Sequence, residues 1–172
     1  MIKKIIILFF VFLASLVVKS QQTPQFSQYI SNYFAINPAM AGSQRCLNFS
    51  IGYRSQWLNL EGAPKTGFGS FSTELKLKKR SMNQSKHGVG MYVENDAIGP
   101  TARTSVNLAY AYHLPISREI NASFGIFAGL HQFKLDASKV SLADSQDPLI
   151  DGSQSTLLVP DFSPGLFLSH KN

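Results

Sequence analysis

The chain is poor in the residues that form disulfides in small exported proteins or that carry out catalysis. Its 172 residues include one cysteine, Cys46, and four histidines that stand singly along the sequence. One cysteine excludes an intramolecular disulfide, and Cys46 has no histidine nearby in sequence to activate it as a nucleophile. The histidines lack metal-ligand spacing, and no glycine and lysine spacing fits a phosphate loop. We therefore expect no enzyme activity, no metal and no cofactor.

Long hydrophobic runs are also absent, except at the N-terminus. There Lys3 and Lys4 precede a mostly apolar run from Ile5 to Val18. This run is shorter than the roughly 20 residues of a membrane-spanning helix, and it has the layout of a secretory signal peptide. We expect cleavage after Ser20 and export of the remaining chain.

Charge is scarce as well, since Asp, Glu, Lys and Arg together make up 15% of the sequence. Without Lys3, Lys4 and Lys19 the formal charge of +6 falls to +3, from 13 basic and 10 acidic residues. This small excess does not favour nucleic acid as a partner. The basic stretch at residues 76–86 is interpreted as a solvated turn or as a contact for an acidic partner or lipid headgroups.

The pattern that dominates the mature chain is alternation of apolar and polar residues. Residues 46–58, 87–95, 104–114 and 120–130 each place apolar side chains on one face with a period of two, which predicts β-strands. Residues 65–77 and 161–170 are predicted as two further strands, so the fold class is all-β with about six strands. The domain organisation is then a signal peptide (1–20), an N-terminal segment (21–45) and a partial β-barrel domain (46–172).

Two all-β architectures share this alternation. In a soluble sandwich the polar face meets water and carries many charges, whereas in an antiparallel outer-membrane β-barrel the apolar face meets lipid. The polar faces here consist mainly of Gly, Ser, Asn and Ala, which favours the barrel. The few charged residues on these faces are expected to face the lumen: Arg54, Glu94 and Arg103.

Aromatic residues near strand ends fit the same interpretation. In membrane barrels such residues form girdles at the two interfaces, although aromatics that fill a sandwich core would give a similar pattern. The residues predicted at the membrane interface are Tyr53, Trp57, Tyr110 and Tyr112. The residues predicted to face lipid are Val106, Leu108, Ile126 and Leu130.

The loops alternate in length, as they do in outer-membrane barrels. Loop parity places the connections after the first, third and fifth strands at one end, and the longest loop, residues 136–160, belongs to this group. Since the long loops of such barrels are extracellular, this end is predicted to be outside and the other end periplasmic.

A short amphipathic helix is predicted between Thr23 and Asn37, because Pro38 disfavours continuation of a helix. It would plug the barrel mouth or lie against it, and an irregular N-terminal arm is the alternative. The apolar face of this helix would consist of Phe26, Tyr29, Ile30, Tyr33 and Phe34.

Six motifs occur in order along the chain: PQFSQY (24–29), NPAMAGS (37–43), YRSQW (53–57), GAPKT (62–66), NDAIGPT (95–101) and NLAYAYHLPI (107–116). As a set, they resemble the PorP/SprF family of the type IX secretion system of Bacteroidota. The resemblance implies an outer-membrane β-barrel that works with secretion and with surface attachment of cargo, including gliding adhesins in some relatives. It also implies outer-membrane lipid, secreted cargo and other type IX components as partners.

Members of this family are about twice this length, and single-chain outer-membrane barrels have about eight strands or more. We therefore expect either the N-terminal half of a larger barrel or a barrel completed by several chains, since unpaired strand edges are not tolerated in lipid.

Two turns are predicted to form a rim that docks a protein partner, because Gly-Pro-rich turns hold their backbones in few conformations. The alternative is that these turns only set strand register. Two other functions stay open: a passive porin for small solutes, which would use lumen residues, and a soluble secreted β-sandwich for adhesion. The predicted rim consists of Gly62, Pro64, Lys65, Thr66, Asn95, Asp96, Gly99, Pro100 and Thr101.

Overall fold

The computed structural model describes residues 32–75, 85–117, 119–137 and 154–170. The predicted signal peptide therefore lies outside the described residues, as does most of the basic stretch at 76–86. The strands are β1 (Asn48–Ser55), β2 (Lys65–Leu75), β3 (Lys86–Ile98), β4 (Thr101–Pro115), β5 (Ile120–Asp136) and β6 (Gln154–His170).

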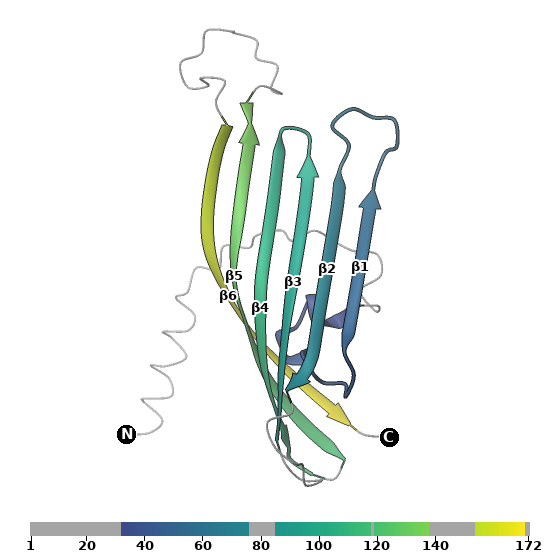
Figure 1. Cartoon of the computed structure of the whole chain (residues 1–172), viewed down its shortest axis with the longest axis vertical. Helices are drawn as coiled ribbons and strands as arrows, with labels where there is room; N and C mark the ends of the chain where they lie inside the picture. The colour runs from purple at the N-terminus through teal and green to yellow at the C-terminus, as the bar shows by residue number, and fades with distance from the viewer. Residues whose placement is uncertain (1–31, 76–84, 118, 138–153, 171–172) are drawn as a thin grey trace, which may run out of the picture.

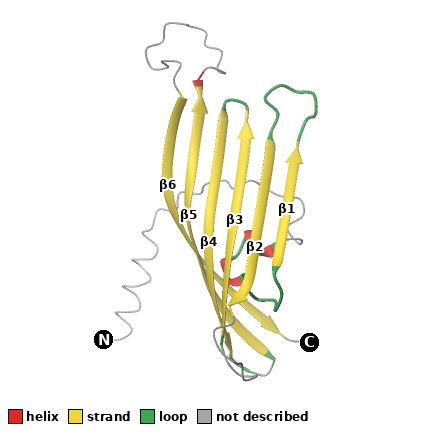
Figure 2. Ribbon diagram, viewed as in Figure 1, coloured by secondary structure: helices red, strands yellow, loops and turns green. Residues whose placement is uncertain are grey.

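The six strands form one antiparallel sheet in which each strand pairs with the next along the chain (Figures 1 and 2). In the described part, β1 and β6 are the two edges, so the sheet is open and resembles part of a barrel. The predicted all-β, antiparallel fold is confirmed. Among the described residues, no helix is both long enough and apolar enough to cross a membrane.

Some predicted boundaries are wrong. The predicted loop at 136–160 is shorter, because β6 begins at Gln154 and residues 154–160 pair with residues 130–136 of β5. Pro160 and Pro164 lie within β6, where an edge strand tolerates proline better than a central strand does. β1 ends at Ser55 instead of Leu58, because Trp57 adopts a positive φ of 49° in the following turn.

The two faces of the sheet differ in an unusual way. On the face that we call the outer face, apolar side chains are exposed, including Phe49 at 71% and Leu108 at 60%. On the opposite, inner face, Ser105 is 2% exposed and Ala111 is fully buried. A water-soluble sandwich buries its apolar face against a second sheet, but the described residues form a single sheet whose apolar face is uncovered.

The inner face is covered by the segment Asn32–Gly42, which we call the inner segment (Figure 1). It contains two single turns of 3₁₀-helix, η2 (Tyr33–Ala35) and η3 (Pro38–Met40). The predicted helix between Thr23 and Asn37 is wrong over its described part, residues 32–37. Asn32 has φ −146° and ψ 67°, and Asn37 is extended with φ −134° and ψ 111°. The extended conformation of Asn37 is the one that a following proline favours.

Tertiary packing explains why the predicted helical face fails here. Phe34 is buried and its ring centroid lies 5.4 Å from that of Phe127 on β5, whereas Tyr33 is exposed. The main core of the described chain thus lies between the inner segment and the inner face of the sheet. It consists of Phe34, Ala41, Tyr92, Ala109, Ala111 and Phe127.

Glycines on the inner face allow this close approach. A β-carbon at Gly88 would collide with the carbonyl group of Ala41, and one at Gly125 would collide with the backbone of Ala39. Ala39 and Ala41 themselves are completely buried. The small residues of the inner face therefore serve to seat a second layer of backbone, in the manner of glycines at close backbone contacts.

Candidate functional site

Strands β1, β3 and β5 all finish at the same end of the sheet, which is the upper end in Figure 1. An antiparallel meander requires this arrangement, since every second connection returns to the same end. The predicted alternation of the connections between the two ends of the sheet is therefore correct. The sides of the membrane assigned to the two ends stay a prediction.

Backbone hydrogen bonds join the β1–β2 connection, the β3–β4 turn and the end of β5. The amide of Gly99 donates to the carbonyl oxygen of Gly62 over 2.9 Å, and the amide of Asp136 donates to that of Pro100 over 2.8 Å. Gly62 and Gly99 have φ values of 75° and 56°, in the left-handed region that favours glycine. The structure thus brings the two predicted rim turns into direct contact and ties the second one to the end of β5.

Side-chain hydrogen bonds further order the predicted rim. Thr66 Oγ1 donates to Asp96 Oδ1 over 2.6 Å, so Asp96 is engaged within the sheet. Thr101 Oγ1 donates to the carbonyl oxygen of Ile98 across the β3–β4 turn over 2.9 Å. Lys65 and Glu61, in contrast, are exposed at this end. Whether the rim docks a partner stays a prediction.

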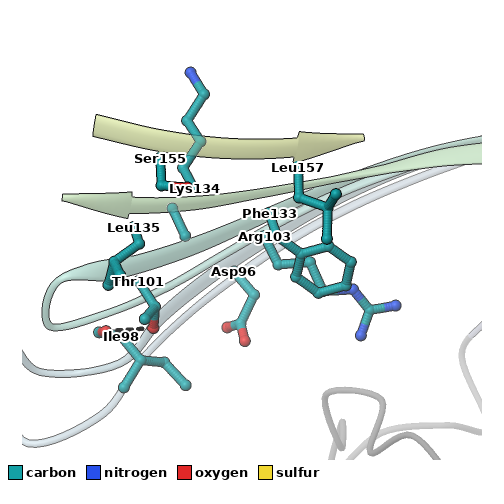
Figure 3. A pocket seen from close by; sticks show the side chains of 10 residues that line it. Asp96, Ile98, Thr101, Arg103, Phe133, Lys134, Leu135, Ser155 and Leu157 are labelled. Carbon is teal, nitrogen blue, oxygen red and sulfur yellow. Dashed lines mark hydrogen bonds between the residues drawn. The ribbon is translucent and has the colours of Figure 1, made fainter. Parts of the chain in front are cut away.

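A pocket of about 410 Å³ opens on the inner face just below this rim (Figure 3). The guanidinium carbon of Arg103 lies 5.7 Å from the centroid of the Phe133 ring, within the range of a cation–π interaction. The side chain of Lys134 points away from the pocket in Figure 3. The pocket is lined by Asp96, Ile98, Thr101, Ala102, Arg103, Phe133, Lys134, Leu135, Ser155 and Leu157.

The three charged residues assigned to the lumen lie on the inner face. Glu94 is 6% exposed and accepts a hydrogen bond from the hydroxyl of Tyr92. Arg103 lines the pocket, and Arg54 is half-buried at the end of β1, where it pairs with Thr66. Sequence reasoning did not find the pocket, because it depends on the register that sets Arg103 opposite Phe133.

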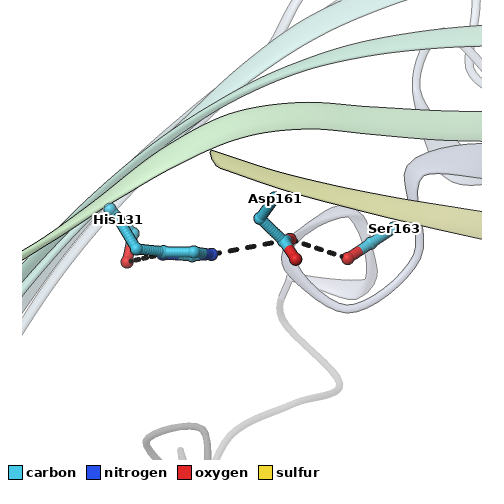
Figure 4. Close-up of polar contacts among 4 residues, drawn as sticks. His131, Asp161 and Ser163 are labelled. Carbon is cyan, nitrogen blue, oxygen red and sulfur yellow. Dashed lines mark hydrogen bonds and ion pairs between the residues drawn. The ribbon is translucent and has the colours of Figure 1, made fainter. Parts of the chain in front are cut away.

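A second polar group, also missed from the sequence, crosses three strands of the inner face (Figure 4). His131 Nδ1 lies 2.7 Å from Ser105 Oγ, and His131 Nε2 lies 3.5 Å from Asp161 Oδ2. Ser163 Oγ donates to the same carboxylate oxygen over 2.9 Å. These residue types also form hydrolase triads, but the side chain of Ser105 on β4 is only 2% exposed.

His113 performs a different task. Its Nε2 lies 2.7 Å from the carbonyl oxygen of Ala41, and its Nδ1 lies 2.7 Å from Ser123 Oγ. Because a carbonyl only accepts, Nε2 carries the proton, and in the neutral ring Nδ1 accepts from the hydroxyl. His113 thus secures the inner segment to β4. Within the described residues, no group of three or more His, Cys, Asp or Glu is arranged to hold a metal ion.

The aromatic residues predicted at the membrane interface lie near opposite ends of the sheet. Tyr53 and Trp57 are exposed at the upper end, whereas Tyr110 and Tyr112 lie towards the lower end. There His87 Nδ1 lies 2.7 Å from the Tyr110 hydroxyl, and the His87 ring packs 5.3 Å from that of Tyr112. The role of these four residues in a membrane stays a prediction.

Comparison with known proteins gives one match. The family model described as type IX secretion system membrane protein PorP/SprF matches residues 18–172. Comparisons with curated proteins and with solved structures each gave no match. Because the match covers most of the sequence, the chain belongs to the PorP/SprF family of type IX secretion system membrane proteins.

Proposed function

We propose that this chain forms part of an outer-membrane β-barrel whose upper rim docks secreted cargo, including adhesins used in gliding. Membership in a type IX secretion membrane protein family supports a role with other components of that system. The observation that carries the membrane placement is the outer face of the described sheet, which is apolar, uncovered and almost free of charge.

The distribution of charge on the outer face supports a lipid-facing band. In the described strands, ionisable groups that alternate onto this face lie near its ends: Lys65, Lys134 and Asp136 above, and His87 and His170 below. Between them lie exposed apolar residues, of which Val106, Leu108, Ile126 and Leu130 were predicted to face lipid. A central apolar band with polar margins is the surface of a membrane barrel.

Strand pairing gives the height of this band. Tyr53 is level with Thr104 through the pairs Tyr53–Gly67, Gly67–Asn95 and Asn95–Thr104. From Thr104 to Tyr110 along β4 is a distance of about 20 Å at the usual rise of a strand. This separation is of the same order as the apolar band of about 25 Å in membrane barrels, which supports aromatic groups near the two margins of that band.

Membrane fractionation tests the placement. We expect the protein in the outer-membrane fraction, with heat-modifiable migration on gels and an N-terminus at Gln21 after signal cleavage. Recovery from the soluble fraction, or retention of Met1 in envelope material, would contradict this part of the proposal.

The rim supports docking because its turns are held before a partner arrives. Hydrogen bonds between Gly62 and Gly99 and between Pro100 and Asp136 tie the two rim turns to each other and to the end of β5. A surface ordered in advance loses less conformational entropy on binding, which favours affinity. The exposed side chains of Glu61 and Lys65 lie on this ordered rim and are available to a partner.

The docking test replaces Glu61 and Lys65 together with Ala and leaves Asp96 intact, because Asp96 holds Thr66. We expect reduced surface display of the cognate cargo at unchanged barrel abundance. The matched control is Lys134→Ala, an exposed lysine level with Lys65 on the outer face but three strands away. Normal display by the double variant, or equal loss in the control, would remove this rim from the mechanism.

A further inference from the structure

We propose that the inner segment, Asn32–Gly42, is a fixed plug that closes the lower half of the lumen to solutes. The chain would then act as a scaffold for attachment and not as an open pore. Closure of a lumen rests on the proposed barrel, because the described sheet is open, whereas the contacts of the segment are properties of the chain.

Side-chain hydrogen bonds anchor the segment at both ends and in between. Asn32 Nδ2 donates to Ser70 Oγ on β2 over 3.1 Å, and Asn37 Nδ2 donates to the carbonyl oxygen of Leu166 on β6 over 2.8 Å. His113 on β4 holds the carbonyl oxygen of Ala41, as described above. The segment therefore crosses the inner face from β2 to β6 and is fastened at three strands.

Packing also holds the segment against the sheet. Phe34 inserts against Gly90 and Phe127, so its aromatic ring fills the space left by the missing side chain of the glycine. The backbone of Ala39 rests on Gly125, and Asn37 and Pro38 rest on Gly165. A loosely held arm would not require glycine at these points, because a mobile backbone has no fixed contact to protect.

These contacts also give hydrogen-bond partners to the polar groups of the segment and to His113. Asn37 uses both ends of its amide, since Oδ1 accepts from the amide of Ala39 over 3.0 Å while Nδ2 donates to β6. The buried His113 has partners at both ring nitrogens only while Ala41 is in place. Withdrawal of the segment would leave His113 with an unpaired group and expose Phe34 and Phe127, so the plugged state is favoured.

Near the rim the inner face is open by comparison, since Phe133 and Leu157 are exposed there. The pocket of about 410 Å³ beside Arg103 and Phe133 lies there, above the rows covered by the inner segment. A solute entering from the upper end would reach this pocket and meet the inner segment below it.

Cysteine labelling tests whether the segment is fixed. The protein is purified from its own membrane, and Ala39→Cys is placed in a background with Cys46→Ser. We expect the cysteine at 39 to react with a maleimide only after heat denaturation, whereas the exposed native Cys46 of the parent reacts in the folded protein. Equal labelling of both positions in folded protein would overturn the proposal.

Conductance in planar bilayers tests closure. We expect no pore current from the parent and a gain of current in Gly125→Val, whose added side chain would displace Ala39. Gly69→Val is the control, because a β-carbon at Gly69 meets no atom within 4 Å. Open-pore current in the parent would overturn the proposal even if Gly125→Val does not fold, and so would a folded, silent Gly125→Val. If the membrane placement itself is wrong, no variant inserts, while the labelling result still reports on the segment.

Discussion

The lower and upper halves of the inner face carry the same alternating pattern but hold different contents. The lower half presents Gly88, Ala111 and Gly125, and backbone from the inner segment fills the space above them. The upper half presents Arg103 beside an open pocket near the rim, while Glu94 on the same face is buried. The difference shows that small residues let backbone lie directly against a polar sheet face.

Charge placement follows the same division. Backbone lies directly against the sheet where the facing residue is glycine, as at Gly88 and Gly125, whereas buried charges require partners. Glu94 and Asp96 lie outside the rows that seat the segment and are paired locally with Tyr92 and Thr66. Three pairs of substitutions test this division.

The largest effect is expected where an arginine is forced into the covered half. Ala109 is 5% exposed beneath the inner segment, and Ala109→Arg should cost about 3 to 5 kcal/mol as an unpaired buried charge. Asn48 is level with Ala109 through Ser72 and Gly90, but it is only half-buried on the edge strand β1. Asn48→Arg should therefore change stability by about 0.5 kcal/mol or less.

Urea unfolding in lipid vesicles measures both variants, with the fluorescence of Trp57, the chain's single tryptophan, as the signal. Similar losses of unfolding free energy at the two positions would show that the inner segment does not cover Ala109 in the membrane.

A smaller effect is expected on the outer face of the same strand. Leu108→Arg places a charge in the middle of the proposed lipid-facing band and should cost about 2 to 4 kcal/mol, falling to about 0 to 1 kcal/mol near the interfaces. Ala97 is level with Lys65 at the upper margin, so Ala97→Arg is the matched control. The same unfolding assay compares them, and equal tolerance at both positions would argue against a membrane-facing surface.

The smallest difference concerns two histidines that each lie 2.7 Å from a serine hydroxyl. His113→Ala leaves the buried carbonyl of Ala41 without its donor and should cost about 1 to 3 kcal/mol. His131 faces the partly exposed Asp161 in the upper half, where water can replace it, so His131→Ala should cost about 1 kcal/mol or less. Thermal unfolding monitored by gel mobility ranks the two, and a larger loss at His131 would reverse the proposed roles of the two halves.

Much of the fold could be predicted from local pattern alone. Alternation over 104–114 and 120–130 predicts strands and assigns Leu108 and Ile126 to the exposed face, because the side-chain period of a strand is two. The ends of the strands were harder to predict, since Pro160 interrupts the alternating pattern although β6 continues through it.

The candidate site was only partly predictable, for a physical reason. The rim turns carry their own glycine signals, so Gly62 and Gly99 could be found from sequence. The contact of His131 with Asp161 and the seat of Ala41 on Gly88 depend on register and on a crossing chain, and neither leaves a local signal. Gly88 and Gly125 are instead indistinguishable in sequence from glycines that merely line a lumen.

The hydrogen bond between Asn37 and Leu166 has a consequence for the order of folding, since it joins residues 129 positions apart. The inner segment leaves the export machinery before any strand, yet its seat on Gly165 does not exist until β6 has paired. Contacts between distant parts of a chain form slowly, because loop closure must precede them. The first described residues of the chain are thus among the last to reach their final position, and their docking can report that the sixth strand is in place.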